Sequence, residues 1–434
     1  MTTSVSQRHR GARRVFPALA VAGVLALAAC SGGSSSGTPT AGGTGSGSTA
    51  DAGGQTITVW HYFSDPNQVA LMDKYAQLFE AAHPGDKVVN TFVPYDQMDS
   101  KVVAAAGSKT GPDIVVFNGA EAATIVLGGG LAPIDDYLSS WADKAQLPDS
   151  VLHVINGKTY AVQGYVNLLG LWYNKDILDK IGVQPPTTID ELEADMQKAK
   201  DAGYGGITLC GLPNSQGEWQ GYPWVTSDGF SYDNLDQDAL ASGLARVRNW
   251  VDKGWLTQEA TTWDQTVPFQ TFAAGNVAFA ENGNWQMGTA KSDAKFSYGV
   301  VPLPLSDKGG IYLGGEGEGV GAFSKNPELA WEYLTASYLS PEGQLSAASM
   351  VGSLPSRLDV AKNSQVTSDP LLVPFAQEIA DKGAVYPSGA IPPEGVADVQ
   401  TAVGQAWSAA IGGQQSPQDA AATAITAVKK AMGK

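Results

Sequence analysis

ITVWHYF, residues Ile57 to Phe63, is an apolar run rich in β-branched and aromatic residues, which indicates a strand. Residues 67–82 follow with Leu71, Tyr75 and Phe79 at helical spacing, and KVVNTF at 87–92 indicates a second strand. A strand, a helix and a second strand in this order form the repeating unit of layered α/β proteins. This stretch therefore predicts an α/β fold.

The same alternation continues along the chain. A helix predicted over 95–108 precedes the apolar strand DIVVF at 113–117, and Thr188 with Glu191 forms a capping box for a helix that reaches about residue 202. GITLC at 206–210 is the strand behind that helix, and further strands are predicted at 277–280 and 296–303. We expect a mainly parallel sheet and further helices at 238–253, 265–274, 327–339, 341–350, 393–411 and 416–432.

The first residues have the pattern of an export signal. Four arginines between positions 8 and 14 precede an uncharged run from Val15 to Ala29, whose apolar centre is shorter than a membrane span. LALAAC, which ends at Cys30, resembles the lipobox of bacterial lipoproteins, and the sequence after it is rich in Gly and Ser. We expect a signal peptide over 1–29, a lipidated Cys30 and a flexible tether over 30–54. The route of export stays open.

Amino-acid composition and net charge indicate the class of protein and argue against one class of binding partner. The chain has 434 residues, is 43% hydrophobic and carries a formal net charge of −16, which is typical of a soluble protein with room for two domains. An acidic surplus of this size argues against nucleic acid as a partner. Cys210 is the only cysteine besides Cys30, and its apolar surroundings predict a buried, inert thiol.

Few residues have the spacing of a catalytic or metal site. His61, His83 and His153 lie far apart, which gives a zinc site little support, and no cofactor is predicted. Glu316 and Glu318 would share one face of an extended segment and are the one candidate pair for a glycosidase. The glycines around them favour a mobile loop over a rigid catalytic pair, so no catalytic residue is predicted.

Longer motifs carry a resemblance to a known family. They occur in order across nearly the whole chain from Ile57, and include FVPYDQMDSKVVAAAGSKTGPDIVVFN, INGKTYAVQGYVNLLGLWYNKDILDKIG, FAAGNVAFAENGNWQMG and GGEGEGVGAFSKNPELAWEYLTASYLSPEGQ. The chain resembles the extracellular solute-binding proteins of ABC importers, in particular the maltose- and oligosaccharide-binding lipoproteins. The resemblance implies two α/β lobes that close on a ligand about a hinge.

The resemblance also implies where the lobes divide. Lobe I would comprise 55–164 and 318–360, and lobe II would comprise 165–317 and 361–434. The hinge crossings would lie near Gly164, near 316–319 and near 360–362. Because each lobe is discontinuous in sequence, no linker should separate them.

Candidate ligand-binding residues follow from the family's pattern and from sugar chemistry. A sugar offers a C–H face to aromatic rings and hydroxyls to carboxylates, amides and backbone groups. Trp285, which follows a predicted turn at 282–284, is the expected stacking platform, although Phe63 could instead be core and Asp65 a helix cap. The full set is Phe63, Ser64, Asp65, Asn118, Glu121, Tyr165, Asn167, Glu218, Trp219, Trp285, Gly314, Gly315, Glu316, Arg357 and Tyr386.

The resemblance predicts a receptor that catalyses nothing. It would act as a monomer, anchored to the outer face of the cytoplasmic membrane through Cys30, and would deliver a di- or oligosaccharide to an ABC permease. Two alternatives stay open: a secreted glycoside hydrolase, and a receptor for a non-sugar solute such as a polyamine or a phosphate ester. The residues at 63–65 and 118–121 depart from those of the maltodextrin receptors, so the identity of the sugar does not follow.

Overall fold

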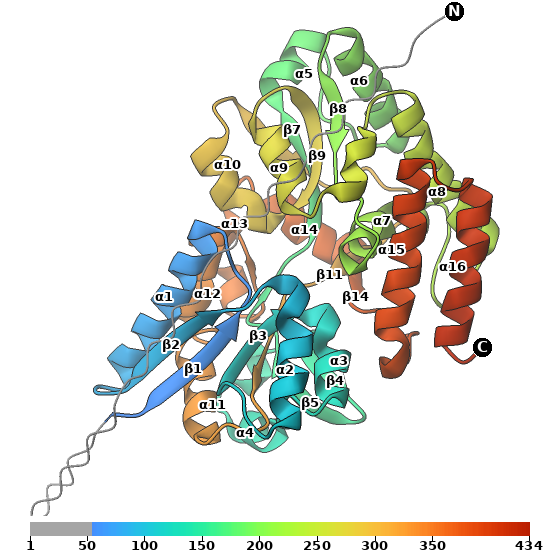
Figure 1. The fold of residues 1–434 in the computed structure, drawn as a ribbon. Helices are drawn as coiled ribbons and strands as arrows, with labels where there is room; N and C mark the ends of the chain where they lie inside the picture. The colour runs from blue at the N-terminus through green and yellow to red at the C-terminus, as the bar shows by residue number, and fades with distance from the viewer. Residues whose placement is uncertain (1–53) are drawn as a thin grey trace, which may run out of the picture. The chain divides into compact units, whose positions relative to one another are not determined.

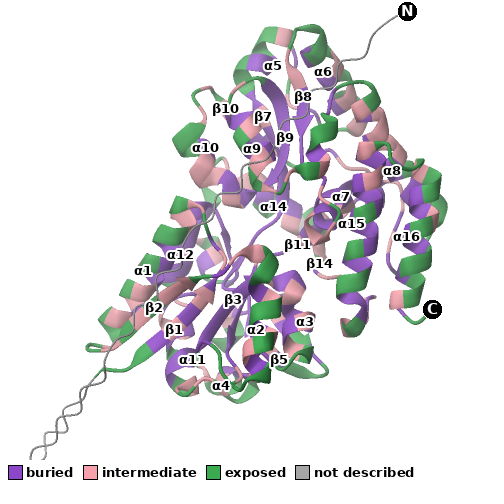
Figure 2. Cartoon of the chain, viewed as in Figure 1, coloured by how far each residue is buried: buried purple, intermediate pink, exposed green. Residues whose placement is uncertain are grey.

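The computed structural model describes residues 54–434, which fold around two separate sheets (Figure 1). The predicted signal peptide, Cys30 and almost all of the tether lie outside the described residues. The predicted α/β class with two lobes is confirmed, and Figure 2 shows most strands of the two sheets buried and the helices with exposed outer faces, whereas the edge strand at 87–92 is partly exposed. Within 54–434, no helix is both long enough and apolar enough to span a membrane.

The first lobe is built on a six-stranded sheet in the order β2-β1-β3-β12-β5-β4. Its strands are β1 (Thr56–His61), β2 (Lys87–Phe92), β3 (Ile114–Asn118), β4 (Leu152–Ile155), β5 (Lys158–Val162) and β12 (Glu316–Val320). The helices of this part of the fold are α1 (Pro66–Ala82), α2 (Met98–Gly107), α3 (Ala122–Leu127), α4 (Asp135–Ser140), α11 (Pro327–Ala336), α12 (Pro341–Val351) and α13 (Ser364–Thr367).

The second lobe is built on a four-stranded sheet in the order β10-β7-β9-β8. Its strands are β7 (Leu169–Asn174), β8 (Gly205–Thr208), β9 (Val277–Gly283) and β10 (Tyr298–Val301). The remaining helices are α5 (Lys175–Ile181), α6 (Ile189–Asp201), α7 (Ser215–Ser227), α8 (Gln237–Asp252), α9 (Thr266–Ala273), α10 (Met287–Asp293), α14 (Val373–Lys382), α15 (Val396–Gly412) and α16 (Pro417–Ala431). α15 and α16 pack on α7 and α8, so the last residues of the chain join this lobe.

Two short strand pairs lie where the chain passes between the sheets. β6 (Tyr165–Val166) pairs with β13 (Leu354–Pro355), and β11 (Ile311–Leu313) pairs with β14 (Gly383–Val385). These pairs bring the 165–167, 311–316 and 352–355 segments together, close to the predicted hinge crossings. The lobe boundaries themselves stay a prediction, although β12 begins at Glu316, two residues before the predicted return to lobe I.

The expected strand–helix–strand unit at the start of the fold is present. β1 and β2 are parallel, and Leu71, Tyr75 and Phe79 of α1 are buried against the sheet, as their spacing predicts. Apolar burial of this kind contributes roughly 25 cal/mol per Å² to folding. The predicted capping box is also present, since Thr188 Oγ1 accepts a hydrogen bond from the Glu191 N–H at 3.2 Å.

The sheets are mixed, whereas a mainly parallel arrangement was predicted. β12 runs antiparallel to both of its neighbours, β3 and β5, and β7 runs antiparallel to β9 and β10. The predicted mobile loop around Glu316 and Glu318 is therefore wrong, because these residues form a central strand. The glycines of β12 have a packing role, since a Cβ at Gly317 would lie 2.4 Å from the Phe117 ring.

A second local prediction also needs correction. β9 continues through Gly283, so residues 282–284 do not form the predicted turn. Asn284 is buried, and its side-chain amide donates to the carbonyl oxygen of Gly352 at 2.8 Å and to Oδ1 of Asn167 at 3.0 Å. Asn284 thus ties the end of β9 to the crossing segments.

The buried thiol is confirmed. Cys210 is fully buried in the second lobe, where the Trp407 indole donates a hydrogen bond to its carbonyl oxygen at 3.0 Å. Burial raises the pKa of the Cys210 thiol to about 12, so the reactive thiolate is scarce at neutral pH.

Candidate functional site

A cavity of about 610 Å³ lies between the two sheets. Its first-lobe wall comes from Tyr62, residues 64–68, Tyr95, Asn118 and Glu316, and its second-lobe wall comes from segments of 215–219, 264–270 and 285–293 together with Tyr386. Its volume falls within the range of about 300–1,000 Å³ that is usual for small-molecule sites. The cavity is thus large enough for a ligand that contacts both lobes.

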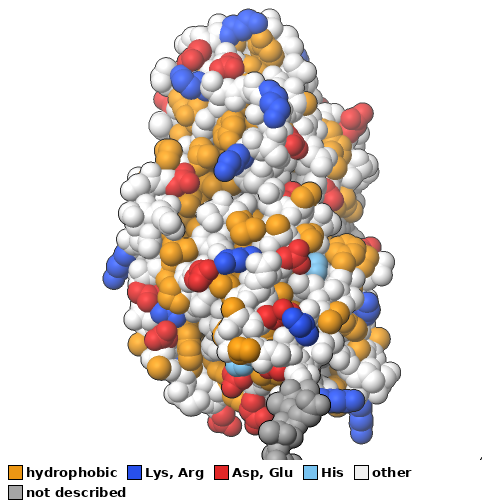
Figure 3. All heavy atoms as spheres, turned by 90° about the vertical axis from the view of Figure 1, so that its left-hand side faces the viewer, with side chains coloured by type: hydrophobic (Ala, Val, Ile, Leu, Met, Phe, Trp, Pro, Cys, Tyr) orange, Lys and Arg blue, Asp and Glu red, His pale blue; other side chains and the backbone are white. Residues whose placement is uncertain are grey.

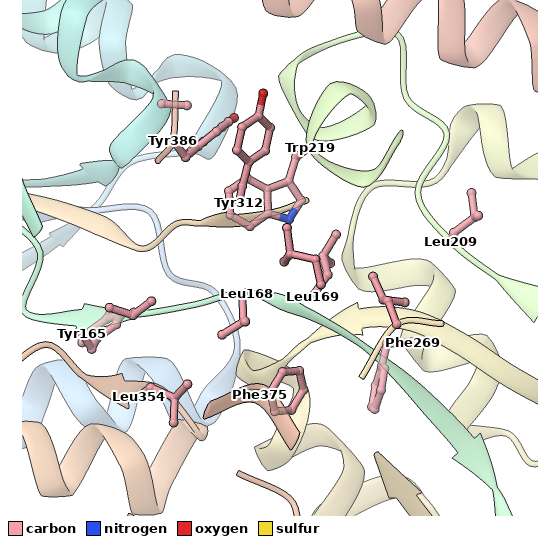
Figure 4. Close-up of a cluster of buried hydrophobic side chains, with 14 of the residues drawn as sticks. Tyr165, Leu168, Leu169, Leu209, Trp219, Phe269, Tyr312, Leu354, Phe375 and Tyr386 are labelled. Carbon is pink, nitrogen blue, oxygen red and sulfur yellow. The ribbon is translucent and has the colours of Figure 1, made fainter. Parts of the chain in front are cut away.

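One side of the cavity is an aromatic cluster. Trp219 meets Tyr386 edge to face with ring centroids 4.5 Å apart, and Tyr312 packs behind both rings (Figure 4). Trp219 also lies flat on the backbone of Gly314, where a Cβ would be 2.1 Å from the indole ring. The ring is 7% exposed, so its position is set before any ligand arrives.

Trp285 forms a second aromatic surface. The short helical turn Asn284–Gln286 follows β9 directly and brings the indole back over Gly283, where a Cβ would lie 1.8 Å from ring atom Cζ3. Trp285 is partly exposed, whereas its neighbours Asn284 and Gln286 are buried. The strand end is therefore fixed while one part of the indole stays open to the cavity.

Tyr62 and Tyr95 supply aromatic rings from the first lobe. Their centroids are 5.2 Å apart in an edge-to-face arrangement, and the Tyr62 hydroxyl donates to Oε1 of Glu316 at 2.8 Å. Oε2 of Glu316 accepts from the Asn167 amide at 3.3 Å. Burial raises the pKa of Glu316, so this carboxyl group gains a proton more readily than an exposed one.

The remaining lining is dominated by uncharged polar groups. Amide side chains project from the first turns of helices and from the short turn after β9, and hydroxyl groups come from both lobes. Amides present one acceptor and two donors each, which suits a ligand with many hydroxyls. The amides are those of Asn67, Gln68, Asn118, Asn167, Gln216, Gln265, Gln270 and Gln286.

Nine of the fifteen predicted ligand-binding residues line this cavity. They come from seven separate stretches of sequence, which the fold brings together. Their contact with a ligand stays a prediction, but their common location agrees with one site. The nine are Ser64, Asp65, Asn118, Asn167, Trp219, Trp285, Gly315, Glu316 and Tyr386.

Three of the other six predicted ligand-binding residues do not line the cavity, because two are buried side chains and the third is covered by an aromatic ring. Phe63 is 2% exposed and packs in the main core, the alternative that the sequence left open. Tyr165, also 2% exposed, stacks on Tyr338 in the first lobe. Gly314 lies beneath the Trp219 ring.

The three charged residues among these six, Glu121, Glu218 and Arg357, do not line the cavity. Glu218 precedes Trp219 on α7 and points the other way, where its Oε1 accepts from the hydroxyls of Tyr232 at 2.6 Å and Tyr312 at 2.8 Å. Burial raises the pKa of Glu218 to about 7. Glu121 is absent from the lining, and burial followed by the charge of Asp99 raises its pKa to about 7.

Arg357, the third of these charged residues, has a structural role. It is 3% exposed and forms ion pairs with Asp143 at 2.9 Å and Asp359 at 2.7 Å. Its guanidinium also donates to the carbonyl oxygen of Leu339 at 2.9 Å. With these partners in place, Arg357 is absent from the cavity lining.

Several lining residues were missed by the sequence analysis. Tyr62 and Tyr95 lie inside quoted motifs and Asn67 lies two residues after Asp65, so they could have been found by considering every aromatic and polar residue of those stretches. No sequence signal marked Asp264, Gln265, Thr266, Gln270, Thr289, Ser292 and Asp293, because isolated polar residues on or beside helices have no distinctive pattern.

Glu316 and Glu318 do not form a pair that faces the cavity. Glu318 is fully buried and absent from the lining, and its Oε2 accepts from the Gly164 N–H at 2.7 Å. Burial, and then the nearby Glu316, raise the pKa of Glu318 well above its ordinary value. Within residues 54–434, no group of three or more His, Cys, Asp or Glu side chains is placed to hold a metal ion.

Comparison with known proteins identifies one family. The family model described as bacterial extracellular solute-binding protein matches residues 74–374. The maltotriose-binding protein of Pyrococcus abyssi is 25% identical over 343 residues, 76% of this chain and 73% of that protein. The diacetylchitobiose binding protein DasA of Streptomyces coelicolor is 26% identical over 375 residues, 81% of this chain and 84% of that protein.

Solved structures share the fold. The GacH receptor of Streptomyces glaucescens, solved unliganded and with acarbose, superposes with a TM-score of 0.79 at 25% identity, covering 88% of this chain and 99% of its own. The maltose/maltodextrin-binding domain MalE of Bdellovibrio bacteriovorus, bound to maltotriose, has a TM-score of 0.74 at 22% identity. It covers 87% of this chain and all of its own, and at this identity it supports the fold alone.

Proposed function

The chain belongs to the bacterial extracellular solute-binding proteins, and we propose that its solute is a carbohydrate, a di- or oligosaccharide held between the two lobes. Closure about the segments that cross between the sheets would bring both cavity walls onto the ligand. The family is one of binding proteins, so the ligand would be captured and released unchanged.

The observation that carries this proposal is the combination of rings and amides in one cavity. Tyr62, Trp219, Trp285 and Tyr386 present aromatic rings, and eight amide side chains lie among them. The faces of aromatic rings attract the weakly positive C–H groups of a pyranose, while amides serve its hydroxyls. Relatives named for maltotriose and diacetylchitobiose binding support the same class of ligand.

The two alternatives fit the cavity less well. A glycosidase needs two carboxyl groups on either side of the scissile bond, about 5–9.5 Å apart, and only Glu316 of the candidate pair lines the cavity. A polyamine would require a cage of free carboxylates around aromatic rings. The carboxylates of Asp65 and Glu316 are already hydrogen-bonded within the protein, and amides outnumber acids in the lining.

We also propose that the protein works at a membrane surface. Lipidated Cys30 and the Gly/Ser-rich tether would hold a monomeric receptor on the outer face of the cytoplasmic membrane, within reach of an ABC permease driven by a cytoplasmic ATPase. The N-terminal sequence and the family support this placement.

A thermal-shift screen against saccharides tests the proposal. A ligand that binds only the folded protein increases its free energy of unfolding by mass action, by about 2.7 kcal/mol when the ligand concentration is a hundred times Kd. The melting temperature rises as a result. We expect at least one neutral di- or trisaccharide to stabilise the protein and to bind with one-to-one stoichiometry in calorimetry. Stabilisation by a polyamine such as spermidine, with no response to any saccharide, would contradict the proposal.

A further inference from the structure

Three helices begin at the wall of the cavity. The first turns of α1, α7 and α9 contribute Asn67, Gln216 and Thr266 to the lining. Helix N-termini carry unpaired N–H groups and partial positive charge, so they are common binding sites for phosphates and carboxylates. Three such ends around one cavity would suit an anionic ligand if their donors were free.

At two of these helices the donors are taken by carboxylates of the chain itself. Oδ1 of Asp65 accepts from the Asn67 N–H at 2.8 Å at the start of α1. Oδ1 of Asp264 accepts from the N–H groups of Thr266 at 2.9 Å and Val267 at 3.2 Å at the start of α9. Both carboxylates lie in the cavity lining, in the place that an anionic ligand group would otherwise occupy.

The third helix start is occupied by a neutral group. Oδ1 of Asn214 accepts from the Gln216 N–H at 3.0 Å, which satisfies the exposed end of α7. This cap adds no negative charge, but it leaves one fewer donor for a ligand. All three helix starts are therefore capped from within the protein.

The lining also lacks a positive side chain. Its residues, all within the described part of the chain, include Asp65, Asp264, Asp293 and Glu316 but no Lys, Arg or His. Lys295 lines a separate hollow that it shares with Asp293, and its ammonium donates to the Ser292 carbonyl oxygen. Asp65 and Asp264 supply the fixed negative charge at the helix starts.

We propose that the cavity rejects saccharides bearing carboxylate, phosphate or sulfate groups, and accepts neutral or amine-bearing ones. This inference rests on the proposed function and adds the charge class of the sugar. An anionic group would find the helix ends capped, two fixed carboxylates nearby and no countercharge. Juxtaposed like charges in a partly dry site cost several kcal/mol and so act as a filter against the wrong ligand.

Matched sugar pairs test the charge filter. The pairs are maltose with maltose 6′-phosphate, trehalose with trehalose 6-phosphate, and the dimethyl ester of digalacturonic acid with the free acid. For each neutral member that binds in calorimetry, we expect the anionic partner to bind at least about tenfold more weakly. Equal or tighter binding of the anionic member would overturn the inference and leave carbohydrate binding intact. Failure of every neutral and amine-bearing saccharide, including chitobiose, would overturn both.

Asp264→Asn tests the assigned residue. Asparagine keeps the Oδ1 acceptor and removes the charge, so we expect the neutral-to-anionic affinity ratio to fall by about threefold or more. The matched control is Asp236→Asn, because Oδ1 of Asp236 caps α8 through the N–H groups of Asp238 at 2.9 Å and Ala239 at 3.1 Å, away from the lining. A ratio that stays unchanged in Asp264→Asn, or that falls equally in the control, would overturn the role of Asp264.

Discussion

Replacing Gly283 by alanine should weaken ligand binding through Trp285 alone. The new Cβ would lie 1.8 Å from Cζ3, 2.1 Å from Cε3 and 2.3 Å from Cη2 of the indole. Carbon atoms pack best at about 3.5–4.0 Å, so the ring would have to withdraw by about 1.7 Å or more. The backbone at Gly283 has φ −90° and ψ 173°, which alanine adopts without strain.

The size of the effect follows from the position of the ring. A central aromatic contact usually contributes about 2 kcal/mol or more to binding, which is about thirtyfold in Kd. A ring displaced by half its own width should lose most of this binding free energy, so we expect the affinity for the ligand to fall by about tenfold to thirtyfold. Because the indole is partly exposed, it can move into the cavity, and stability should change by less than about 1 kcal/mol.

Calorimetry and thermal melting of the same variants separate the two effects. Trp285→Ala measures the full contribution of the ring, and Gly107→Ala is the control because its Cβ would have nothing within 4 Å. Wild-type affinity in Gly283→Ala would refute the view that Gly283 positions a ligand-stacking ring. Unchanged affinity with a stability loss of about 3–5 kcal/mol in Trp285→Ala would show that the indole is core.

Burial raises the pKa of Glu218 to about 7 and that of Glu281 to about 8, so the stability they contribute is present below about pH 4.5 and is lost as pH rises through these values. The melting temperature should therefore fall between about pH 4.5 and 8, and Glu281→Gln should flatten that slope; an unchanged slope would contradict the assignment. Arg357→Met should lower stability by about 1–3 kcal/mol, because the buried Leu339 carbonyl oxygen loses its donor, while the Asp143 and Asp359 carboxylates are about half exposed; sugar affinity should stay unchanged, and a selective loss of affinity would contradict its structural role. Cys30→Ser should move the protein from the membrane to the soluble fraction, and sedimentation after a high-salt wash would point to another anchor. Prolonged incubation with the bound sugar should yield no product, and hydrolysis beyond one equivalent would favour a glycosidase.

The strands β1, β2, β3, β8, β9 and β10 and longer helices such as α1, α8, α15 and α16 were predictable because their apolar residues recur with a clear period, whereas β4, β5 and β7 and the helices α5, α7, α10 and α14 were not predicted. α1 and β1 follow directly from Leu71, Tyr75 and the run at 57–63. β12 was not predictable, because its sequence EGEGV has neither alternating apolar residues nor branched side chains until Val320. Its place as a central strand depends on the side chains of Phe117 and Leu131, which fill the space beside Gly317 and Gly319, and sequence alone does not reveal this packing.

The site was predictable in part for a similar reason. Trp219 and Trp285 stand out as large rings beside small or polar residues, and both line the cavity. Glu218 shows the limit, because adjacent residues on a helix point about 100° apart and only the packing of α7 decides which one faces the ligand. Asp264 and Gln270 could not be found, since their meaning comes from where the N-terminus of α9 lies in space. Figure 3 shows acidic and basic side chains scattered over one face of the molecule, so surface charge does not indicate the position of the site either.

β12 lies far along the sequence from the other strands of its sheet, and this separation affects how the chain folds. Tyr62 and Glu316, which share a hydrogen bond in the first lobe, are 254 residues apart, and β12 separates β3 from β5 in the sheet. Closing so long a loop costs entropy before the contacts form, and such non-local pairing slows folding. The first lobe therefore cannot complete its sheet until most of the second lobe has been synthesised. Until then β3 and β5 expose open edges, and these edges are where aggregation during export should begin.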